Sequence, residues 1–217
     1  MGETGTDRPR ILRAAERTAA PWSNGGGVTR EVAVHPPGSG WDGFDWRVSL
    51  AEVTRDGPYS PLPGVRRILT VVDGAGTELT VDGRTHQLTG RFRPFSFPGD
   101  AVTEGRLPAG PIVNLNVMLR DGRAAATVET VRGRRSVPTA PGNGPDAGRG
   151  GPVVLVVALE GGTRLAGAAE PVVLERFDAA LFAGEGADGT GPCPQRQWEL
   201  HTDGVAALIT LTPAGPL

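Results

Sequence analysis

The sequence predicts an all-β fold, and two observations support this prediction. Apolar and polar residues alternate through much of the chain, which is the pattern of strands that are buried on one face. Turn-forming residues interrupt this alternation at short intervals, since the 217 residues include 33 glycines and 20 prolines. Segments between such turns are too short for long helices. A β protein of this length forms either one large unit or two small barrels.

Eight strands are expected in the first half of the chain. The strongest local signal is the pair Asp82-Gly83, which is typical of a two-residue hairpin turn between two adjacent strands. The expected strands cover residues 11–14, 28–34, 45–53, 66–73, 77–81, 84–89, 94–97 and 112–119.

A second, poorer set of strands is expected after residue 151. These strands cover residues 153–159, 171–175, 179–182, 198–201 and 205–211, with Asp203-Gly204 as a turn between the last two. Residues 138–151 are rich in glycine and proline and predict a mobile connection, and residues 1–9 are expected to be disordered. We therefore expect a first barrel over residues 10–137 and a second, degenerate barrel over residues 152–217, with strands exchanged between the halves.

Composition and charge argue against several classes of partner. The formal net charge is -2, and the basic residues are spread along the chain, so no nucleic-acid partner is expected. No apolar run is long enough to span a bilayer, and the N-terminus lacks the apolar core of a secretory signal. The single cysteine, Cys193, cannot form an internal disulfide. These features predict a cytoplasmic protein without a membrane partner.

Three of the expected strands carry polar side chains on one face and bulky apolar side chains on the other. The polar faces hold Thr29 and Glu31, Arg47 and Ser49, and Asn114 and Asn116. Asparagine is disfavoured in strand interiors, so two asparagines on one face favour amide groups bonded inside a closed polar cavity. The alternative is that these faces form the solvated outside of a sandwich.

A small carboxylate is the ligand that suits these side chains best. Arg47 would form a bidentate pair with the carboxylate, and Glu31 would hold Arg47 when the ligand is absent. A proline-rich loop over residues 56–64 leads into Arg66 and Arg67, which point to opposite faces of the next strand, so at least one of them is expected to point inward. The candidate ligand-binding residues are Asn24, Thr29, Glu31, Arg47, Ser49, Ser60, Arg66, Asn114 and Asn116.

The glycine run at residues 25–27 has two interpretations. Consecutive glycines bring backbone N–H groups close to a bound anion, or they form a plain flexible loop. The run is not a phosphate-binding loop of the Gly-Lys-Ser/Thr type, because no such sequence follows and a strand is expected where a helix would be needed.

No metal ion or other cofactor is expected. The three histidines, His35, His86 and His201, are widely separated, and no pair has the spacing of metal ligands within one strand. No Gly-x-Ser-x-Gly sequence marks a serine nucleophile.

Five motifs in the first half of the chain resemble those of the HutD/Ves family. They are PWSNGGGVTRE at residues 21–31, FDWRVS at 44–49, DGPYS at 56–60 with Pro63-Gly64, FPGD at 97–100 and NLNVM at 114–118. The resemblance covers residues 20–120, whereas the second half matches only in its strand pattern.

The resemblance implies a bicupin fold and, in the HutD branch, an association with histidine utilisation. Such a protein is proposed to sense pathway flux by binding an intermediate such as urocanate or formylglutamate, while the Ves branch is named for stress induction. Two alternatives stay open. One is a metal-free enzyme of the isomerase or lyase type with Glu31 or Tyr59 as general base. The other is a stress-related interaction protein, in which the second barrel would serve as the surface of a homodimer.

Overall fold

The computed structural model describes residues 8–138, 152–168, 170–183 and 197–214. Regular structure in these residues consists of strands and one short 3₁₀ helix, η1 (Ala14–Glu16), which confirms the all-β prediction. No helix in the described ranges has the length and hydropathy needed to cross a bilayer. The expected disordered terminus, apart from its last two residues, the connection after Pro138 and Cys193 lie outside the described residues.

The chain divides into two compact units. Residues 17–124 form one unit, which we call the site unit, and the described parts of residues 1–16 and 125–214 form the other, the sheet unit. This division differs from the boundary expected after residue 137. The reason is strand pairing, because β12 (Ala124–Val137) pairs with β17 (Trp198–Pro213), and β1 (Arg10–Leu12) pairs with β16 (Ala179–Ala183).

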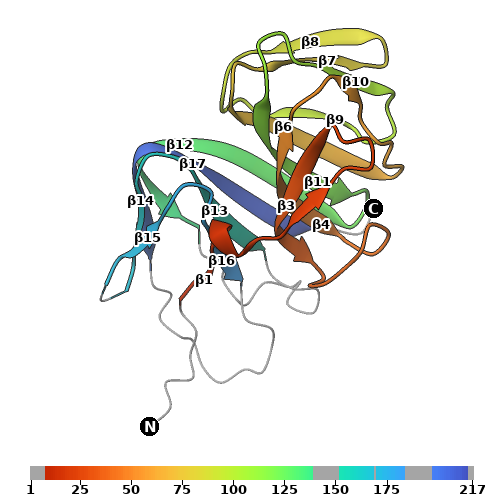
Figure 1. Ribbon diagram of the computed structural model, residues 1–217. Coiled ribbons are helices and arrows are strands. Elements are labelled where there is room, and N and C mark those ends of the chain that lie inside the picture. The colour runs from red at the N-terminus through yellow and green to blue at the C-terminus, as the bar shows by residue number, and fades with distance from the viewer. Residues whose placement is uncertain (1–7, 139–151, 169, 184–196, 215–217) are drawn as a thin grey trace. The chain divides into compact units, whose positions relative to one another are not determined.

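The site unit contains two antiparallel sheets (Figure 1). The six-stranded sheet has the order β2 (Ala19–Pro21), β3 (Gly27–His35), β4 (Trp46–Val53), β11 (Ile112–Arg120), β6 (Val65–Asp73), β9 (Phe95–Pro98). The four-stranded sheet has the order β5 (Gly57–Pro58), β10 (Thr103–Arg106), β7 (Thr77–Val81), β8 (Arg84–Leu88). A buried apolar cluster that includes Leu69 and Val71 of one sheet and Leu79 and Val81 of the other joins the two.

All eight strands expected in the first half occur, and their ends lie within two residues of the predicted ends. Asp82 and Gly83 form the turn between β7 and β8, with φ angles of 47° and 78°. Positive φ at both central residues is what a type I′ hairpin turn requires. The alternation in the sequence did not reveal the short strands β2, β5 and β10.

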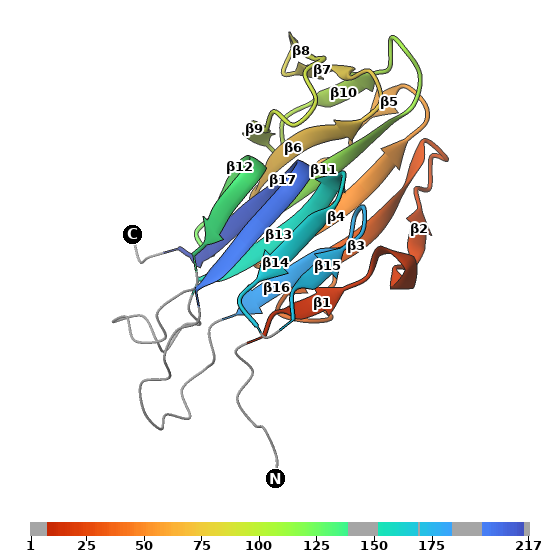
Figure 2. The ribbon, with the colours of Figure 1, turned by 90° about the vertical axis from the view of Figure 1, so that its left-hand side faces the viewer.

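The sheet unit contains one seven-stranded sheet (Figure 2). Its order is β1, β16, β13 (Val153–Glu160), β17, β14 (Thr163–Ala166), β15 (Val172–Leu174), and β12 pairs with β17. Its buried core includes Val154, Leu165, Trp198 and Leu208.

The turn predicted at Asp203-Gly204 is wrong, because β17 continues through both residues. β17 pairs with β13 as far as Val205 and with β14 from Thr202, so Asp203 and Gly204 lie between the two pairings. Gly204 lies so close to the Glu160 carbonyl that a side chain there would overlap it, and its N–H donates to Thr202 Oγ1 at 3.2 Å. The Asp-Gly pair therefore stands within one long strand, where it packs against Gly161 and Gly162 between β13 and β14.

Asp178 ties the N-terminal segment to the sheet unit. Its buried carboxylate accepts hydrogen bonds from Arg13 Nη1 at 2.6 Å and from the backbone N–H groups of Ala14 at 2.7 Å and Glu175 at 3.1 Å. Burial acts to raise the pKa of Asp178, but these donors and the Arg13 charge outweigh it, so the pKa is lowered. The folded state therefore favours the ionised carboxylate.

Asp178→Asn is expected to lower the free energy of unfolding at neutral pH by about 1–3 kcal/mol, because partly buried donors lose a charged acceptor. Since the pKa is lower in the folded state, the carboxylate's contribution is present above the unfolded-state pKa and is lost as pH falls through the folded-state pKa. Urea unfolding at a series of pH values measures this. The difference from the parent should shrink in acid, and the exposed Glu170→Gln serves as control. A difference that stays constant with pH contradicts the assignment.

Candidate ligand-binding site

The six-stranded sheet of the site unit forms the floor of a cavity of about 480 Å³. Volumes of several hundred Å³ are typical of small-molecule sites. Strands β3, β4, β11 and β6 supply polar side chains to it, namely Thr29, Ser49, Asn114, Asn116 and Arg67. The other residues around the cavity are Ala20, Pro21, Trp22, Ser23, Asn24, Trp41, Ala51, Pro58, Tyr59, Ser60, Leu62 and Met118.

Strand register explains why these polar side chains meet. On β11, Asn116 lies opposite Ser49 of β4, and Met118 lies between Arg47 of β4 and Arg67 of β6. Neighbouring strands are separated by about 5 Å, so each cross-strand row brings its side chains within reach of one ligand.

The two asparagines on β11 are buried and have unused bonding capacity. The side-chain oxygens of Asn114 and Asn116 have no hydrogen-bond partner among the described protein groups. A buried polar atom without a partner costs free energy, so these amides favour a ligand that bonds to them.

Arg67 is the cation of the cavity. The residue is 6% exposed, and its guanidinium carbon lies 4.9 Å from the centre of the Tyr59 ring and 5.3 Å from that of Phe97. Its Nε is buried without a hydrogen-bond partner, and none of the ion pairs in the described part of the chain involves it. Burial lowers the pKa of Arg67, while its interaction with Tyr59 acts in the opposite direction.

Tyr59 reaches Arg67 from the loop that precedes β6. The backbone N–H of Tyr59 donates to Thr103 O at 2.9 Å. Its ring packs directly over Gly105, where a methyl group would lie 2.9 Å from the ring. Burial raises the pKa of the Tyr59 phenol, against the effect of the Arg67 charge, so the phenol keeps its proton at neutral pH and can donate a hydrogen bond.

Arg47 and Glu31 form an ion pair with each other. Arg47 Nη2 lies 2.8 Å from Glu31 Oε2, and the Arg47 guanidinium carbon lies 4.4 Å from the centre of the Trp41 ring. Neither Arg47 nor Glu31 lines the cavity. This is the ion pair expected between Glu31 and Arg47, whereas ligand binding by either residue stays a prediction.

The arginine at the cavity is Arg67, whereas Arg47 and Arg66 were the arginines expected there. Arg66 is exposed and does not line the cavity. Of the other candidates, those around the cavity are Asn24, Thr29, Ser49, Ser60, Asn114 and Asn116. Ligand binding by these residues stays a prediction.

The glycine run forms a self-contained turn between β2 and β3. Gly25 N–H donates to Trp22 O at 2.9 Å, and Gly26 N–H donates to Asn24 Oδ1 at 2.9 Å. Trp22 Nε1 donates to Thr29 Oγ1 at 2.8 Å, which fixes the indole at the cavity. The amides of Gly25 and Gly26 are therefore used within the loop and do not point at an anion.

The cavity lining does not suit a metal ion. It contains no histidine, cysteine, aspartate or glutamate, and Arg67 repels cations. No group of three such residues with a metal-binding arrangement occurs in the ranges that the structure describes. Two of the histidines pack against aromatic rings instead. The ring centres of His35 and Trp46 are 5.7 Å apart, and those of His86 and Phe95 are 4.5 Å apart.

Two solved structures resemble this chain over nearly their whole length. HutD from Pseudomonas fluorescens has 31% sequence identity and a TM-score of 0.75, with 95% of this chain and 99% of that chain covered. A conserved protein of unknown function from Pseudomonas aeruginosa has 29% identity and a TM-score of 0.73, with 95% and 98% covered. A cupin 2 conserved barrel domain protein from Leptotrichia buccalis, at 8% identity and a TM-score of 0.53, shares the fold.

Two curated relatives match about half of the chain. An uncharacterized 21.2 kDa protein in the hutC 3′ region of Pseudomonas putida is 36% identical over 120 residues, which is 55% of this chain and 63% of the relative. Protein Ves of Citrobacter koseri is 39% identical over 109 residues, 49% of this chain and 56% of the relative. The chain thus spans less than two thirds of the length of these relatives.

The HutD family model matches residues 14–199, which is most of the chain. This match and the relatives confirm the resemblance seen in the five sequence motifs. The protein belongs to the HutD family, which is associated with the histidine utilisation locus.

Proposed function

We propose that the protein binds a small carboxylate metabolite in this cavity without a metal ion, and that it regulates histidine utilisation by sensing an intermediate such as urocanate or formylglutamate. The observation that supports this most is Arg67, a buried cation at the cavity that forms no ion pair within the described part of the chain. An anionic ligand removes the cost of burying that charge. We also propose that the two units are both cupin barrels.

The proposed binding mode follows from the residues around Arg67. Its guanidinium forms a bidentate pair with the ligand carboxylate, as planar arginine forks do. The Asn114 and Asn116 amides bond to polar atoms elsewhere on the ligand, and the Trp22 and Tyr59 rings contact its apolar part.

Binding fits these residues better than turnover. A general base must be able to accept a proton from the substrate. The carboxylate of Glu31 is occupied by Arg47 and does not line the cavity, and burial raises the pKa of Tyr59, which keeps its phenol protonated.

Calorimetry and thermal shift with urocanate, formylglutamate, histidine and glutamate test the proposal. At least one of the acids should bind with a Kd below about 0.1 mM, or about -5.5 kcal/mol. The methyl ester of urocanate and the diamide of formylglutamate are matched controls without a carboxylate and should bind at least about tenfold more weakly. If no member of the panel binds below about millimolar concentration, the proposal is abandoned.

Asn116→Asp is expected to weaken binding of the acid by about tenfold, or 1.4 kcal/mol. The new carboxylate lies diagonally across from Arg67 on the adjacent strand, so it competes with the ligand for the guanidinium. Asn116→Leu, which removes the amide without adding charge, is the control and should weaken binding less. Calorimetry compares the two variants, and equal losses would show that the charge at this position does not reach Arg67.

A further inference from the structure

We infer that Arg47 is a positioning residue, which holds the indole of Trp41 against the cavity instead of binding the ligand itself. This inference extends the proposed function, because it identifies the Trp41 indole as a part of the cavity lining that contacts the ligand. Only the part that concerns ligand affinity rests on that function.

Trp41 lines the cavity, and about half of its surface is exposed. It lies in the segment between β3 and β4. The guanidinium of Arg47 over the ring is the one ring or charge contact of this indole among the described residues. A cation over an indole face is attractive, so the orientation of the ring depends on Arg47.

The backbone around Trp41 is fixed at one point and loosely packed beside it. The Trp41 carbonyl accepts a hydrogen bond from Arg120 Nη2 at 2.9 Å. Side chains added at Gly38 or Gly40 would have no atom within 4 Å. The segment therefore keeps its position at residue 41, while the indole can turn if its contact with Arg47 is lost.

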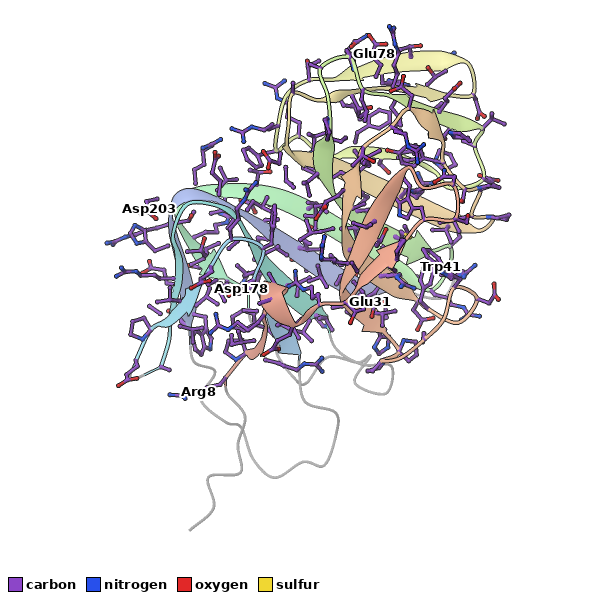
Figure 3. The ribbon with its side chains drawn as sticks, in the orientation of Figure 1. Arg8, Glu31, Trp41, Glu78, Asp178 and Asp203 are labelled. Atoms are coloured by element: carbon purple, nitrogen blue, oxygen red, sulfur yellow. The ribbon has the colours of Figure 1, made fainter. Side chains whose placement is uncertain are left out.

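Glu31 holds Arg47 in this position. The two side chains form the ion pair at 2.8 Å, and Figure 3 shows Glu31 and Trp41, the two partners of Arg47, in the same part of the site unit. The Arg47 side chain is 15% exposed and that of Glu31 is 38% exposed, so the pair is partly shielded from water. Because Glu31 neutralises Arg47, the positive charge that attracts an anion is that of Arg67.

A measurement without ligand tests the positioning role. Acrylamide quenching of tryptophan fluorescence is compared between the parent and Trp41→Phe to isolate the signal of Trp41. Arg47→Met should raise the quenching constant of Trp41 by about twofold, because the ring loses the cation that covers one face. Arg47→Lys, which keeps a cation, should restore part of the protection, and Arg66→Met should change nothing. Unchanged quenching in Arg47→Met overturns the inference.

A double-mutant cycle then separates positioning from direct binding, with formylglutamate as the probe in calorimetry. Arg47→Met should weaken binding by about fivefold in the parent and by no further factor in a Trp41→Ala background. An equal loss in both backgrounds would mean that Arg47 touches the ligand, and the inference would be overturned. If formylglutamate does not bind the parent, that result counts against the proposed ligand, and the quenching experiment still decides the role of Arg47.

Discussion

Arg67→Met is expected to raise the Kd for the carboxylate ligand at least about 100-fold, which corresponds to about 2.7 kcal/mol. The variant keeps an unbranched apolar side chain but removes the guanidinium that the ligand carboxylate needs. Losing one partner of a buried charge pair costs this much or more in other binding sites. Calorimetry with the ligand identified in the panel measures the effect.

The same substitution should leave the free protein at least as stable as the parent. The guanidinium is buried without an ion-pair partner in the described residues, so an apolar side chain of similar volume removes a desolvation cost. Arg66→Met is the matched control on the other face of β6 and should change neither affinity nor stability. Arg67→Met that binds as tightly as the parent would refute the assignment of the anchor.

Gly27→Ala is expected to lower the free energy of unfolding by about 2–4 kcal/mol. Gly27 pairs with Val53 where β3 meets β4, and an added methyl group would overlap the carbonyl oxygen of Glu52. The strands would have to separate at the loop that carries Trp22. Urea unfolding measures the loss.

Gly40→Ala is the control for this substitution, because a side chain there meets nothing within 4 Å. Its free energy of unfolding should stay within about 0.5 kcal/mol of that of the parent. If Gly27→Ala is equally harmless, the close approach of the two strands at this position is not essential.

The polar face of the sheet was predictable from the sequence, because side-chain direction in a strand follows directly from alternation. This places Ser49, Asn114 and Asn116 on one surface, and the structure puts all three at the cavity. The hairpin at Asp82-Gly83 was predictable for a similar local reason, since its turn needs residues that accept positive φ.

The choice between neighbouring arginines was not predictable in this way. The local sequence does not distinguish Arg66 from Arg67. Only the pairing of β6 with β11 decides which of them faces Met118 and the cavity. Arg47 is on the predicted face, but its partners Glu31 and Trp41 take it out of the cavity lining. Such contacts between distant segments are set by tertiary packing.

Two aromatic residues of the site had a signal in the sequence that strand alternation does not use. Both stand in loops within the quoted motifs, where Trp22 is two residues from the candidate Asn24 and Tyr59 precedes the candidate Ser60. At Asp203-Gly204, by contrast, the sequence contains a turn signal but the structure contains no turn. The pair has the composition of a turn, yet pairing with β13 and β14 on one side keeps β17 continuous.

The central claim is that Arg67 receives the ligand carboxylate, and the Nε–H resonance of Arg67 in a ¹H–¹⁵N spectrum tests it most directly. The chain contains 22 arginines and no lysine. The Arg67→Lys variant lacks one arginine Nε–H resonance, and the missing resonance is that of Arg67. Adding formylglutamate should shift this resonance in proportion to the occupancy measured by calorimetry, while that of Arg66 stays in place. Binding by calorimetry with an unmoved Arg67 resonance would contradict the account.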